Sequence, residues 1–237
     1  MLQRGTTPRT RDGGVSWAES SLATLNSGKV LFLSGSSTPT AFQHTVAAPA
    51  IFAGVGVQAH AIAAAEAVQR AFQVGYFRVY TSDDVIGAEV GGAVKNVIAI
   101  ACGMADGLGF GHNTRAAAIT RGLAEITRLG VRLGCNPLTL AGLAGMGDLV
   151  LTCNGPQSRN RQAGLLFAQG KTLVQVQAEM KQVAEGIRTV RSVHDLAAKV
   201  GVEMPISAAM YRVLYEGKPV GQVMSDLLGR PPRHELG

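Results

Sequence analysis

A lysine stands inside a segment that is otherwise apolar. Lys95 belongs to the sequence GGAVKNVIAI, and residues 86–104 have the composition of one buried helix. A buried ammonium group is costly unless it is paired or loses its charge. The small residues Gly91, Gly92 and Ala93, one turn earlier, would let a ligand or another backbone approach the amine. Lys95 is therefore a candidate functional residue, and the alternative is a lysine that extends to solvent.

A second candidate site lies where a loop meets a helix, in the sequence QSRNR. Ser158, Arg159 and Asn160 place a hydroxyl, a guanidinium and an amide in one turn. A helix start adds free N–H groups and the positive end of the helix dipole, so the pattern favours phosphate binding. The alternative is an ordinary helix cap with solvated arginines. Asp148, in the sequence GMGDLV, is a candidate site acid or the cap of the helix that follows it.

The sequence gives no sign of metal or disulfide chemistry. Its three cysteines are far apart and lack a CxxC motif, which predicts buried thiols in a reducing compartment. Its five histidines show no metal-ligand spacing, so no metal site is expected. The sequence GVGVQA at 54–59 fits the pattern GxGxxA, but no acid follows about 20 residues later to bind a ribose. We interpret it as a plain strand-to-helix turn.

The composition is that of a globular protein with a weak excess of positive charge. The chain has 237 residues, of which 46% are hydrophobic, and this excludes a disordered chain. The net charge of +6 favours anionic partners, such as a phosphorylated small molecule. A basic stripe with interleaved aromatic residues is absent, so nucleic-acid binding is not expected. No secretory signal and no run of about 18 apolar residues is found, so no membrane span is expected.

The order of elements predicts two parts. Apolar runs at 29–33, 50–53 and 77–80 predict strands, and residues 61–72, with Glu66 and Arg70 four positions apart, predict a helix. This is a partial α/β unit. After residue 85 nearly every segment has helical period. Helices are expected at 86–104, from a cap at Asn113 to Gly134, from Asn136-Pro137 onward, and near 159–169, 173–180, 185–199, 206–216 and 220–228.

Taken in order, six motifs resemble those of a known family. They are GGAVKNVIAIACGMADGLGFG, NTRAAAITRGLAE, GMGDLVLTC, QSRNR, VAEGIRTV and GVEMPI. They are similar to NAD(P)-dependent glycerol-3-phosphate dehydrogenase of the bacterial and plastid type, and the resemblance is dense from about Phe77 to Leu228. It implies a partial Rossmann-like α/β segment at 28–85, followed by an all-α substrate domain at 86–237 like the helical domain of 6-phosphogluconate dehydrogenase. Residues 1–27 stay unassigned.

The resemblance implies roles for the candidate residues. The family's proton-transferring lysine corresponds to Lys95, and its substrate-contacting aspartate corresponds to Asp148. Its Ser-Arg-Asn substrate triplet corresponds to Ser158, Arg159 and Asn160. The cofactor, NAD or NADP, would carry the hydride while Lys95 donates or accepts the proton.

Further contacts follow from the same resemblance. Arg159, Val183 and Glu185 would contact the cofactor. The sequence LSGSS partly matches a family turn, SGPSFA, which would make Gly35 and Ser37 substrate contacts. The family's GxGxxG turn is not found, so the chain would begin near the middle of the cofactor domain. We therefore expect that this chain neither binds NAD(P)H tightly nor turns over.

The implied reaction interconverts sn-glycerol 3-phosphate and dihydroxyacetone phosphate and feeds glycerophospholipid synthesis. The alternative is a catalytically inactive member of the family that acts only as a helical oligomerisation or binding module. The expected partner is the small phosphorylated substrate. Formation of a homodimer is left as an open alternative. The cytoplasm is the expected compartment, with the plastid stroma as the alternative.

Overall fold

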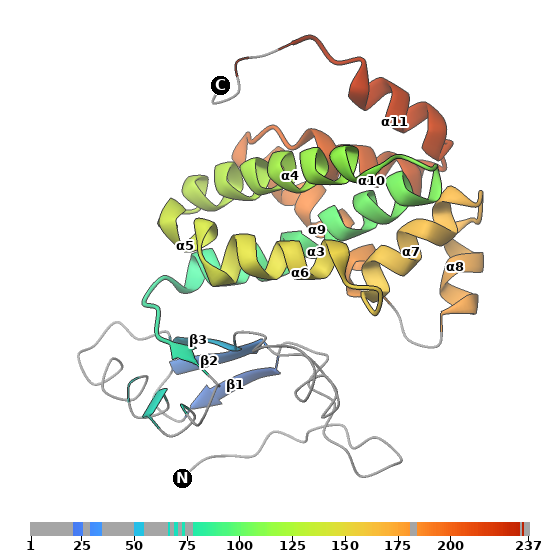
Figure 1. Cartoon of the computed structure of the whole chain (residues 1–237). Helices are drawn as coiled ribbons and strands as arrows, with labels where there is room; N and C mark the ends of the chain where they lie inside the picture. Colours follow the sequence, from blue (N-terminus) through green and yellow to red (C-terminus); the bar gives the residue numbers. More distant parts are fainter. Residues whose placement is uncertain are drawn as a thin grey trace. The chain divides into compact units, whose positions relative to one another are not determined.

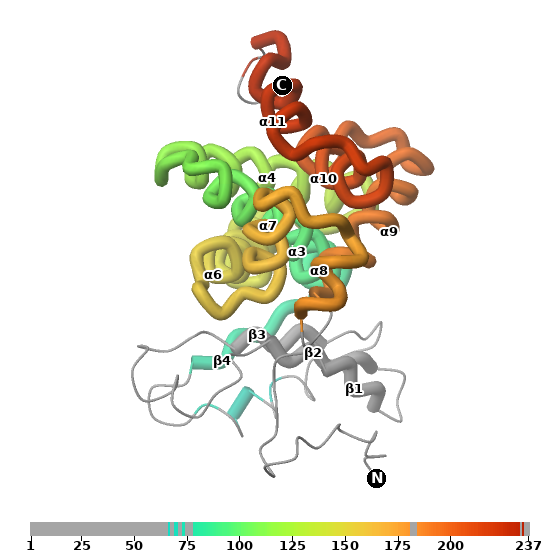
Figure 2. The backbone as a smooth tube through the Cα atoms, turned by 90° about the vertical axis from the view of Figure 1, so that its right-hand side faces the viewer, coloured from blue at the N-terminus to red at the C-terminus, as the bar shows by residue number. Residues whose placement is uncertain are grey.

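The chain divides into two compact units, Met1–Ala88 and Glu89–Gly237. A computed structural model describes the backbone of residues 21–25, 29–34 and 50–54. It describes backbone and side chains of residues 66, 69–70, 73, 78–180, 184–232 and 234. Within these residues, the first unit contains the strands and the second is built from helices (Figures 1 and 2).

The first unit contains a four-stranded sheet in the order β1-β2-β3-β4. Its strands are β1 (Ser21–Leu25), β2 (Lys29–Ser34), β3 (Ala50–Gly54) and β4 (Val79–Tyr80). β1 pairs antiparallel with β2, β2 pairs antiparallel with β3, and β3 pairs parallel with β4. The three expected strands are therefore present, and β1 lies in the stretch that the sequence left unassigned.

This pairing does not confirm the expected Rossmann-like segment. Parallel strands need a crossover connection of a dozen or more residues. Only residues 26–28 separate β1 from β2, with Leu25 opposite Lys29, so this pair has to be antiparallel. Within the helix expected at 61–72, Glu66, Gln69 and Arg70 are helical. Glu66 and Arg70 form the expected i,i+4 ion pair at 3.7 Å, and the other residues of that helix lie outside the described part.

The helices that build the second unit follow one another with short connections, and α3, the first of them, begins at Val85, just before the boundary at Glu89. Their bounds are α3 (Val85–Gly107), α4 (His112–Arg132), α5 (Pro137–Ala141), the π-helical turn η1 (Leu143–Gly147), α6 (Asp148–Asn154), α7 (Arg159–Ala168), α8 (Leu173–Glu179), α9 (Glu185–Val200), α10 (Pro205–Glu216) and α11 (Val220–Leu228). In Figures 1 and 2, α3 runs through the middle of this unit with other helices around it. The all-α domain expected from the sequence is confirmed, and η1 is an element that the sequence did not predict.

α3 supplies much of the core of the helical unit. Val97, Ile98, Ile100 and Met104 are fully buried. Although the sequence indicated no membrane span, α3 is long and apolar enough to cross a membrane by length and composition. More than half of its most apolar 18-residue window is buried inside the protein. α3 therefore has the packing of a core helix.

Two glycines allow α7 to lie directly against α3. A Cβ atom on Gly103 would lie 2.0 Å from the carbonyl oxygen of Arg161, and a Cβ atom on Gly164 would lie 2.2 Å from the carbonyl oxygen of Ile100. Any side chain at either position would push the two backbones apart. The start of α7, which carries the QSRNR motif, is therefore held at a fixed distance from the helix that carries Lys95.

Several predicted helix ends are confirmed. Asn136 accepts a hydrogen bond from the Leu138 amide at 3.0 Å, and Pro137 occupies the first position of α5. Gly201 and Gly217 end α9 and α10 in the left-handed conformation, with φ of 70° and 67°. These residues fix where the chain turns between neighbouring helices.

The predicted cap at Asn113 is wrong. α4 begins one residue earlier, at His112, and Gly111 is the cap residue without a side-chain hydrogen bond. The first turn of α4 is held instead by Arg115, whose guanidinium donates to the carboxylate of Asp106 on α3 at 2.6 and 2.9 Å. A contact between helices thus replaces the local cap that the sequence suggested.

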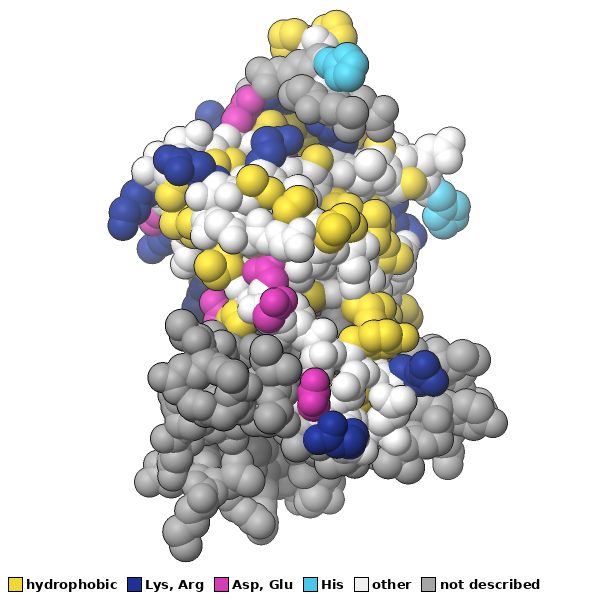
Figure 3. All heavy atoms as spheres, turned by 90° about the vertical axis from the view of Figure 1, so that its left-hand side faces the viewer, with side chains coloured by type: hydrophobic (Ala, Val, Ile, Leu, Met, Phe, Trp, Pro, Cys, Tyr) yellow, Lys and Arg dark blue, Asp and Glu magenta, His cyan; other side chains and the backbone are white. Residues whose placement is uncertain are grey.

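Charged side chains are dispersed on the face of the helical unit that Figure 3 draws. Lys and Arg side chains occur there singly or in small groups, between apolar and acidic ones. On this face they form no continuous basic stripe of the kind that nucleic-acid binding uses.

Candidate active site

Lys95 on α3 and Asp148 on α6 form an ion pair. Nζ of Lys95 donates a hydrogen bond to Oδ2 of Asp148, and the two side chains are only 14% and 12% exposed. Lys95 therefore does not extend into solvent. The structure brings together the two charged residues that the sequence had singled out separately, from positions 53 residues apart.

The small residues before Lys95 admit a second backbone, as expected. A Cβ atom on Gly91 would lie 2.5 Å from the carbonyl oxygen of Ala144 in η1, so glycine is required there. Around the corresponding Cβ position of Gly92, no atom lies within 4 Å. Gly91 thus brings η1 against α3, while Gly92 leaves space beside the same turn.

The π-helical turn η1 sets the position of Asp148. The Gly147 amide donates to the carbonyl oxygen of Gly142 at 3.1 Å, which is the five-residue spacing of a π-helix. A Cβ atom on Gly145 would lie 1.9 Å from the carbonyl oxygen of Leu140, so this tight turn requires glycine. α6 begins at Asp148 with Gly147 as its cap residue. Asp148 is therefore not the helix cap, and its carboxylate contacts Lys95 instead.

Asn160 joins three of the predicted site segments through its buried side chain. Its Nδ2 donates to Oδ1 of Asn96 at 2.9 Å, and its Oδ1 accepts from the Gly186 amide at 2.9 Å. Asn96 follows Lys95 in the sequence and Gly186 follows Glu185. A Cβ atom on Gly186 would lie 2.6 Å from Oδ1 of Asn160, so this contact also requires glycine. One amide side chain thus fixes the starts of α7 and α9 against the turn of α3 that carries Lys95.

The other residues of the triplet lie at the start of α7. Ser158 is the cap residue, and its hydroxyl accepts from the Arg161 amide at 3.3 Å. Arg159 is the first helical residue and is partly exposed. The predicted helix start is confirmed. Its side chains combine a cap with a cation beside free N–H groups, which is the arrangement that anions prefer.

Glu185 is the first residue of α9 and is exposed. The buried amide of Asn160 holds the adjacent residue, so Glu185 stands on a well-fixed helix start. The predicted contacts Val183, Gly35 and Ser37 lie outside the described residues.

Sequence reasoning missed a carboxylate that holds three helices together. Oδ1 of Asp106 on α3 accepts from Arg115 of α4. Oδ2 accepts from Nε of Arg161 on α7 at 2.8 Å and forms an ion pair with Nη2 of the same residue at 2.7 Å. Asp106 is 7% exposed in its side chain. Arg161 is the last residue of the QSRNR motif, and Asp106 lies in the motif ADGLGFG. Both members of this ion pair were therefore present in motifs that the sequence had already singled out.

A second missed carboxylate, that of Glu125 on α4, is buried at the start of α10. It accepts from the Ile206 amide at 2.5 Å, and from the amide and hydroxyl of Ser207 at 3.1 and 3.0 Å. Burial raises the pKa of Glu125 to about 6, although these hydrogen bonds oppose the shift. In the sequence, the feature that could have revealed Glu125 is its place as a single acid beside Ile126 on the apolar face of α4.

The cysteines are free and buried, as expected. A hydrogen bond with Cys102 and burial raise the pKa of the Cys153 thiol above its usual range. Among the described residues, no group of His, Cys, Asp or Glu side chains could hold a metal ion.

Comparisons with known proteins show the family to which the chain belongs. A family model described as NAD-dependent glycerol-3-phosphate dehydrogenase C-terminus matches residues 84–225. The glycerol-3-phosphate dehydrogenase [NAD(P)+] of Geobacter metallireducens is 53% identical over 210 residues, which are 89% of this chain and 61% of that protein. The protein of the same name from Myxococcus xanthus is 60% identical over 168 residues, 71% of this chain and 50% of that protein.

A solved structure is similar as well. The crystal structure of glycerol-3-phosphate dehydrogenase from Coxiella burnetii is 39% identical, with a TM-score of 0.76 over 85% of this chain and 61% of that one. These matches place the chain in a family of nicotinamide-dependent oxidoreductases. Within that class, the chain belongs to the NAD-dependent glycerol-3-phosphate dehydrogenase family, so the predicted resemblance is confirmed. It spans about half to three fifths of the length of the relatives it matches.

Proposed function

We propose that the chain carries the substrate-binding and proton-transfer residues of an oxidoreductase that interconverts sn-glycerol 3-phosphate and dihydroxyacetone phosphate. The observation that carries the proposal is the nearly buried pair of Lys95 and Asp148, in a chain that belongs to this family. Charged side chains with so little exposure are costly, and a site that needs a positioned ammonium explains their presence.

Lys95 is proposed as the proton donor and acceptor. In the reducing direction, its ammonium would polarise the substrate carbonyl and donate the proton to the carbonyl oxygen as the neighbouring carbon accepts a hydride. In the oxidising direction, the neutral amine would accept the proton of the substrate hydroxyl. Asp148 accepts a hydrogen bond from Nζ, so it orients the amine, and its second carboxylate oxygen would contact a substrate hydroxyl.

The start of α7 is proposed as the substrate site. Arg159 is a cation at a helix N-terminus, where phosphate is stabilised by charge and by free N–H groups. Ser158 would add a hydroxyl, and Asn160 keeps a second amide hydrogen besides the one that Asn96 accepts. Because Asn160 bridges to Asn96, the phosphate site is fixed relative to Lys95 by one rigid contact. Gly35 and Ser37 are retained as predicted substrate contacts.

The coenzyme would be NAD or NADP, whose nicotinamide supplies or accepts the hydride. The described residues fit such a group at two points. Arg159 is a partly exposed cation and Glu185 an exposed acceptor, and both stand on helix starts that the Asn160 side chain joins. Val183 is the third predicted contact. The reaction would supply glycerophospholipid synthesis in the cytoplasm.

The test is calorimetric titration of dihydroxyacetone phosphate, NADH and NADPH, combined with a reduction assay. We expect dihydroxyacetone phosphate to bind to the wild type and to Lys95→Met, and turnover, where a coenzyme binds, to be lost in that variant. Lys171→Met is the matched control, because Lys171 pairs with Glu179 at the surface. The coenzyme titrations also decide whether this chain binds NAD(P)H tightly. Failure of the substrate to bind would contradict the proposal and favour a helical binding module.

A further inference from the structure

The carboxylate of Asp106 acts on both ends of the 155–158 loop, which leads from α6 into the proposed substrate site. Arg115 of α4 donates to Oδ1 of Asp106 at 2.6 and 2.9 Å. The same guanidinium donates to Oδ1 of Asn154, the last residue of α6, at 3.4 Å. Arg161, in the first turn of α7, donates to Oδ2 of Asp106 at 2.8 Å. Asp106 therefore holds the far end of the loop directly and the near end through Arg115.

The three charged side chains form a nearly buried network. The side chain of Asp106 is 7% exposed, and those of Arg115 and Arg161 are 18% exposed each. Both guanidinium groups are paired inside the protein, so their role is to hold neighbouring segments. Hydrogen bonds between a guanidinium and a carboxylate are short and have a fixed geometry. The network is therefore suited to hold a loop in one position.

The first turn of α7 is bonded to α3 at two separate points. Asn160 donates to Asn96 at 2.9 Å, and Arg161 donates to Asp106 at 2.8 Å. Asn96 and Asp106 are ten positions apart on α3, which corresponds to about 15 Å along a helix. A helix held at one point can turn about that point, whereas two points so far apart also fix its direction. The contact with Asn96 thus fixes where α7 begins, and the contact with Asp106 fixes how it is oriented.

We infer that Asp106 is a positioning residue for the substrate site at the start of α7. The inference rests on the proposed function, which assigns Ser158 and Arg159 to the substrate. Asp106 would contact neither substrate nor coenzyme, and it would act through Arg161 by fixing the start of α7 relative to Lys95. Such positioning matters because a displacement of about 1 Å at a site can cost about 100-fold in rate. The alternative is that the Asp106 carboxylate only stabilises the helical unit.

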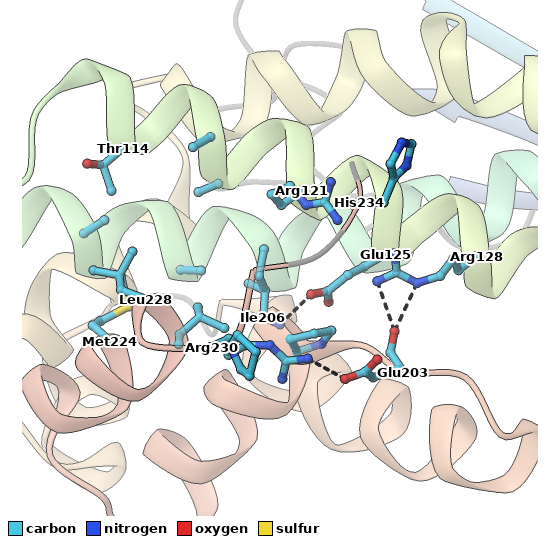
Figure 4. A pocket seen from close by; sticks show the side chains of 17 residues that line it. Thr114, Arg121, Glu125, Arg128, Glu203, Ile206, Met224, Leu228, Arg230 and His234 are labelled. Carbon is cyan, nitrogen blue, oxygen red and sulfur yellow. Dashed lines mark hydrogen bonds and ion pairs between the residues drawn. The ribbon is translucent and has the colours of Figure 1, made fainter. Parts of the chain in front are cut away.

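Glu125 is the matched control, because its buried carboxylate also joins two helices. Figure 4 shows this carboxylate turned toward Ile206 at the start of α10, and it accepts from the Ile206 amide at 2.5 Å. It also accepts from the amide and the hydroxyl of Ser207 at 3.1 and 3.0 Å. Neither Ile206 nor Ser207 is assigned above to substrate or coenzyme. If loss of a buried carboxylate acts only on stability, Asp106→Asn and Glu125→Gln should therefore affect ligand binding alike.

The test is calorimetric titration of dihydroxyacetone phosphate and of inorganic phosphate into the wild type, Asp106→Asn and Glu125→Gln. Asparagine keeps the size of the side chain, but its NH₂ group faces one of the two arginines, so one of the two contacts is lost. We expect Asp106→Asn to weaken the binding of both ligands about tenfold and Glu125→Gln to change it less than about twofold. Urea unfolding of the three proteins shows that each is folded under the conditions of the titration.

Two further variants show which contact acts. Arg161→Gln removes the contact with α7 and leaves the one between Asp106 and Arg115, so it should weaken binding as much as Asp106→Asn. It also tests the inference if Asp106→Asn does not fold. Asp106→Glu keeps the carboxylate, and the long arginine side chains can adjust to it, so its affinity should be within about threefold of the wild type.

Equal affinity in the wild type, Asp106→Asn and Arg161→Gln would overturn the inference. Equal losses in Asp106→Asn and Glu125→Gln would also overturn it, because a general loss of stability would then explain both. A third contrary result is that Asp106→Glu binds no better than Asp106→Asn, since the carboxylate would then not be the group that acts. If the wild type binds neither ligand, the proposed function fails and this inference fails with it. The two failures are distinguishable, because only the second appears in the wild type.

Discussion

The Asp148 carboxylate accepts a hydrogen bond from the Lys95 ammonium, although the two residues are 53 positions apart. Two local features produce this contact. Gly91 lets the backbone of η1 lie against α3, and the π-helical turn then sets Asp148 at the first position of α6. Because both side chains are nearly buried, the pair has consequences for chemistry and for stability that can be measured separately.

Replacing Lys95 tests the chemistry. In an enzyme of this family that contains the complete coenzyme domain and these residues, Lys95→Met should lower kcat and kcat/KM at least about 100-fold, the effect of losing a general acid–base group. Substrate affinity should change much less, because methionine keeps the length of the side chain. Steady-state assays measure both constants. A variant that keeps more than half of the turnover would exclude Lys95 as the proton donor.

Replacing Asp148 tests how much the Lys95–Asp148 ion pair contributes to the stability of the fold. Asp148→Ala should lower the free energy of unfolding by about 3 kcal/mol, because it leaves the Lys95 charge without its partner. The double variant Lys95→Met/Asp148→Leu should recover most of this loss, because no charge then remains. Urea unfolding measures all three proteins.

The control for Asp148→Ala is Glu179→Ala. Glu179 is 51% exposed and pairs with Lys171, so its replacement should cost less than about 1 kcal/mol. Equal losses for the two alanine variants would show that solvent screens the Lys95 pair as fully as it screens the surface pair.

The sequence predicted the helical unit well because its signals are local. Apolar residues at helical spacing, and glycine or Asn-Pro at the helix ends, act within a few residues of each other, so α7 to α11 were placed nearly as the structure has them. The motifs also indicated the family. The prediction at Asn113 was wrong because the start of α4 is held by the Asp106–Arg115 contact between helices, and not by a local cap.

What the sequence could not predict depends on contacts between distant segments. η1 has no periodic pattern in the sequence. Only the structure shows that this turn places Asp148 in contact with Lys95. The bridge from Asn160 to Asn96 and Gly186 gives that residue a packing role that its motif did not suggest. In the sheet, the antiparallel pairing of β1 with β2 follows from strand β1, which no pattern in residues 1–27 had indicated.

The phosphate site can be tested through Arg159. In an enzyme of this family that contains these residues and a coenzyme domain, Arg159→Ala should raise the KM for dihydroxyacetone phosphate about tenfold or more, because a charge-assisted hydrogen bond is worth about 1.5–3 kcal/mol. Inorganic phosphate should compete with substrate in the wild type and much less in the variant. Asp148→Asn should leave inhibition by phosphate nearly unchanged, and Arg188→Ala, an exposed arginine of α9, is the charge control. If inorganic phosphate competes with substrate equally well in Arg159→Ala and in the wild type, Ser158, Arg159 and Asn160 act only as a helix cap and not as a phosphate site.

Glu125 should make stability depend on pH. Its pKa in the folded protein is about 6, above the ordinary value of 4.5, so the folded state holds the proton more tightly. This contribution to stability is complete below pH 4.5 and is lost as the pH rises through 6. The free energy of unfolding of the wild type relative to Glu125→Gln should therefore fall by about 2 kcal/mol between pH 4 and pH 7.

Urea unfolding across that pH range measures the difference, with Glu89→Gln at an exposed position of α3 as the control. The control difference should stay nearly constant. A wild-type advantage over Glu125→Gln that grows with pH would mean that the three hydrogen bonds outweigh burial and that the pKa of Glu125 is lowered instead.

Two glycines of α3 should respond in opposite ways to the same substitution. Gly103→Ala places a Cβ atom 2.0 Å from the backbone carbonyl oxygen of Arg161, so α3 and α7 must separate and the free energy of unfolding should fall by about 2 kcal/mol or more. Gly92→Ala meets no atom within 4 Å, and alanine is the better helix former, so it should stabilise the protein by about 0.5–1 kcal/mol. Urea unfolding of both variants measures the contrast. Equal changes in the two would mean that backbone entropy, and not the contact between α3 and α7, governs both positions.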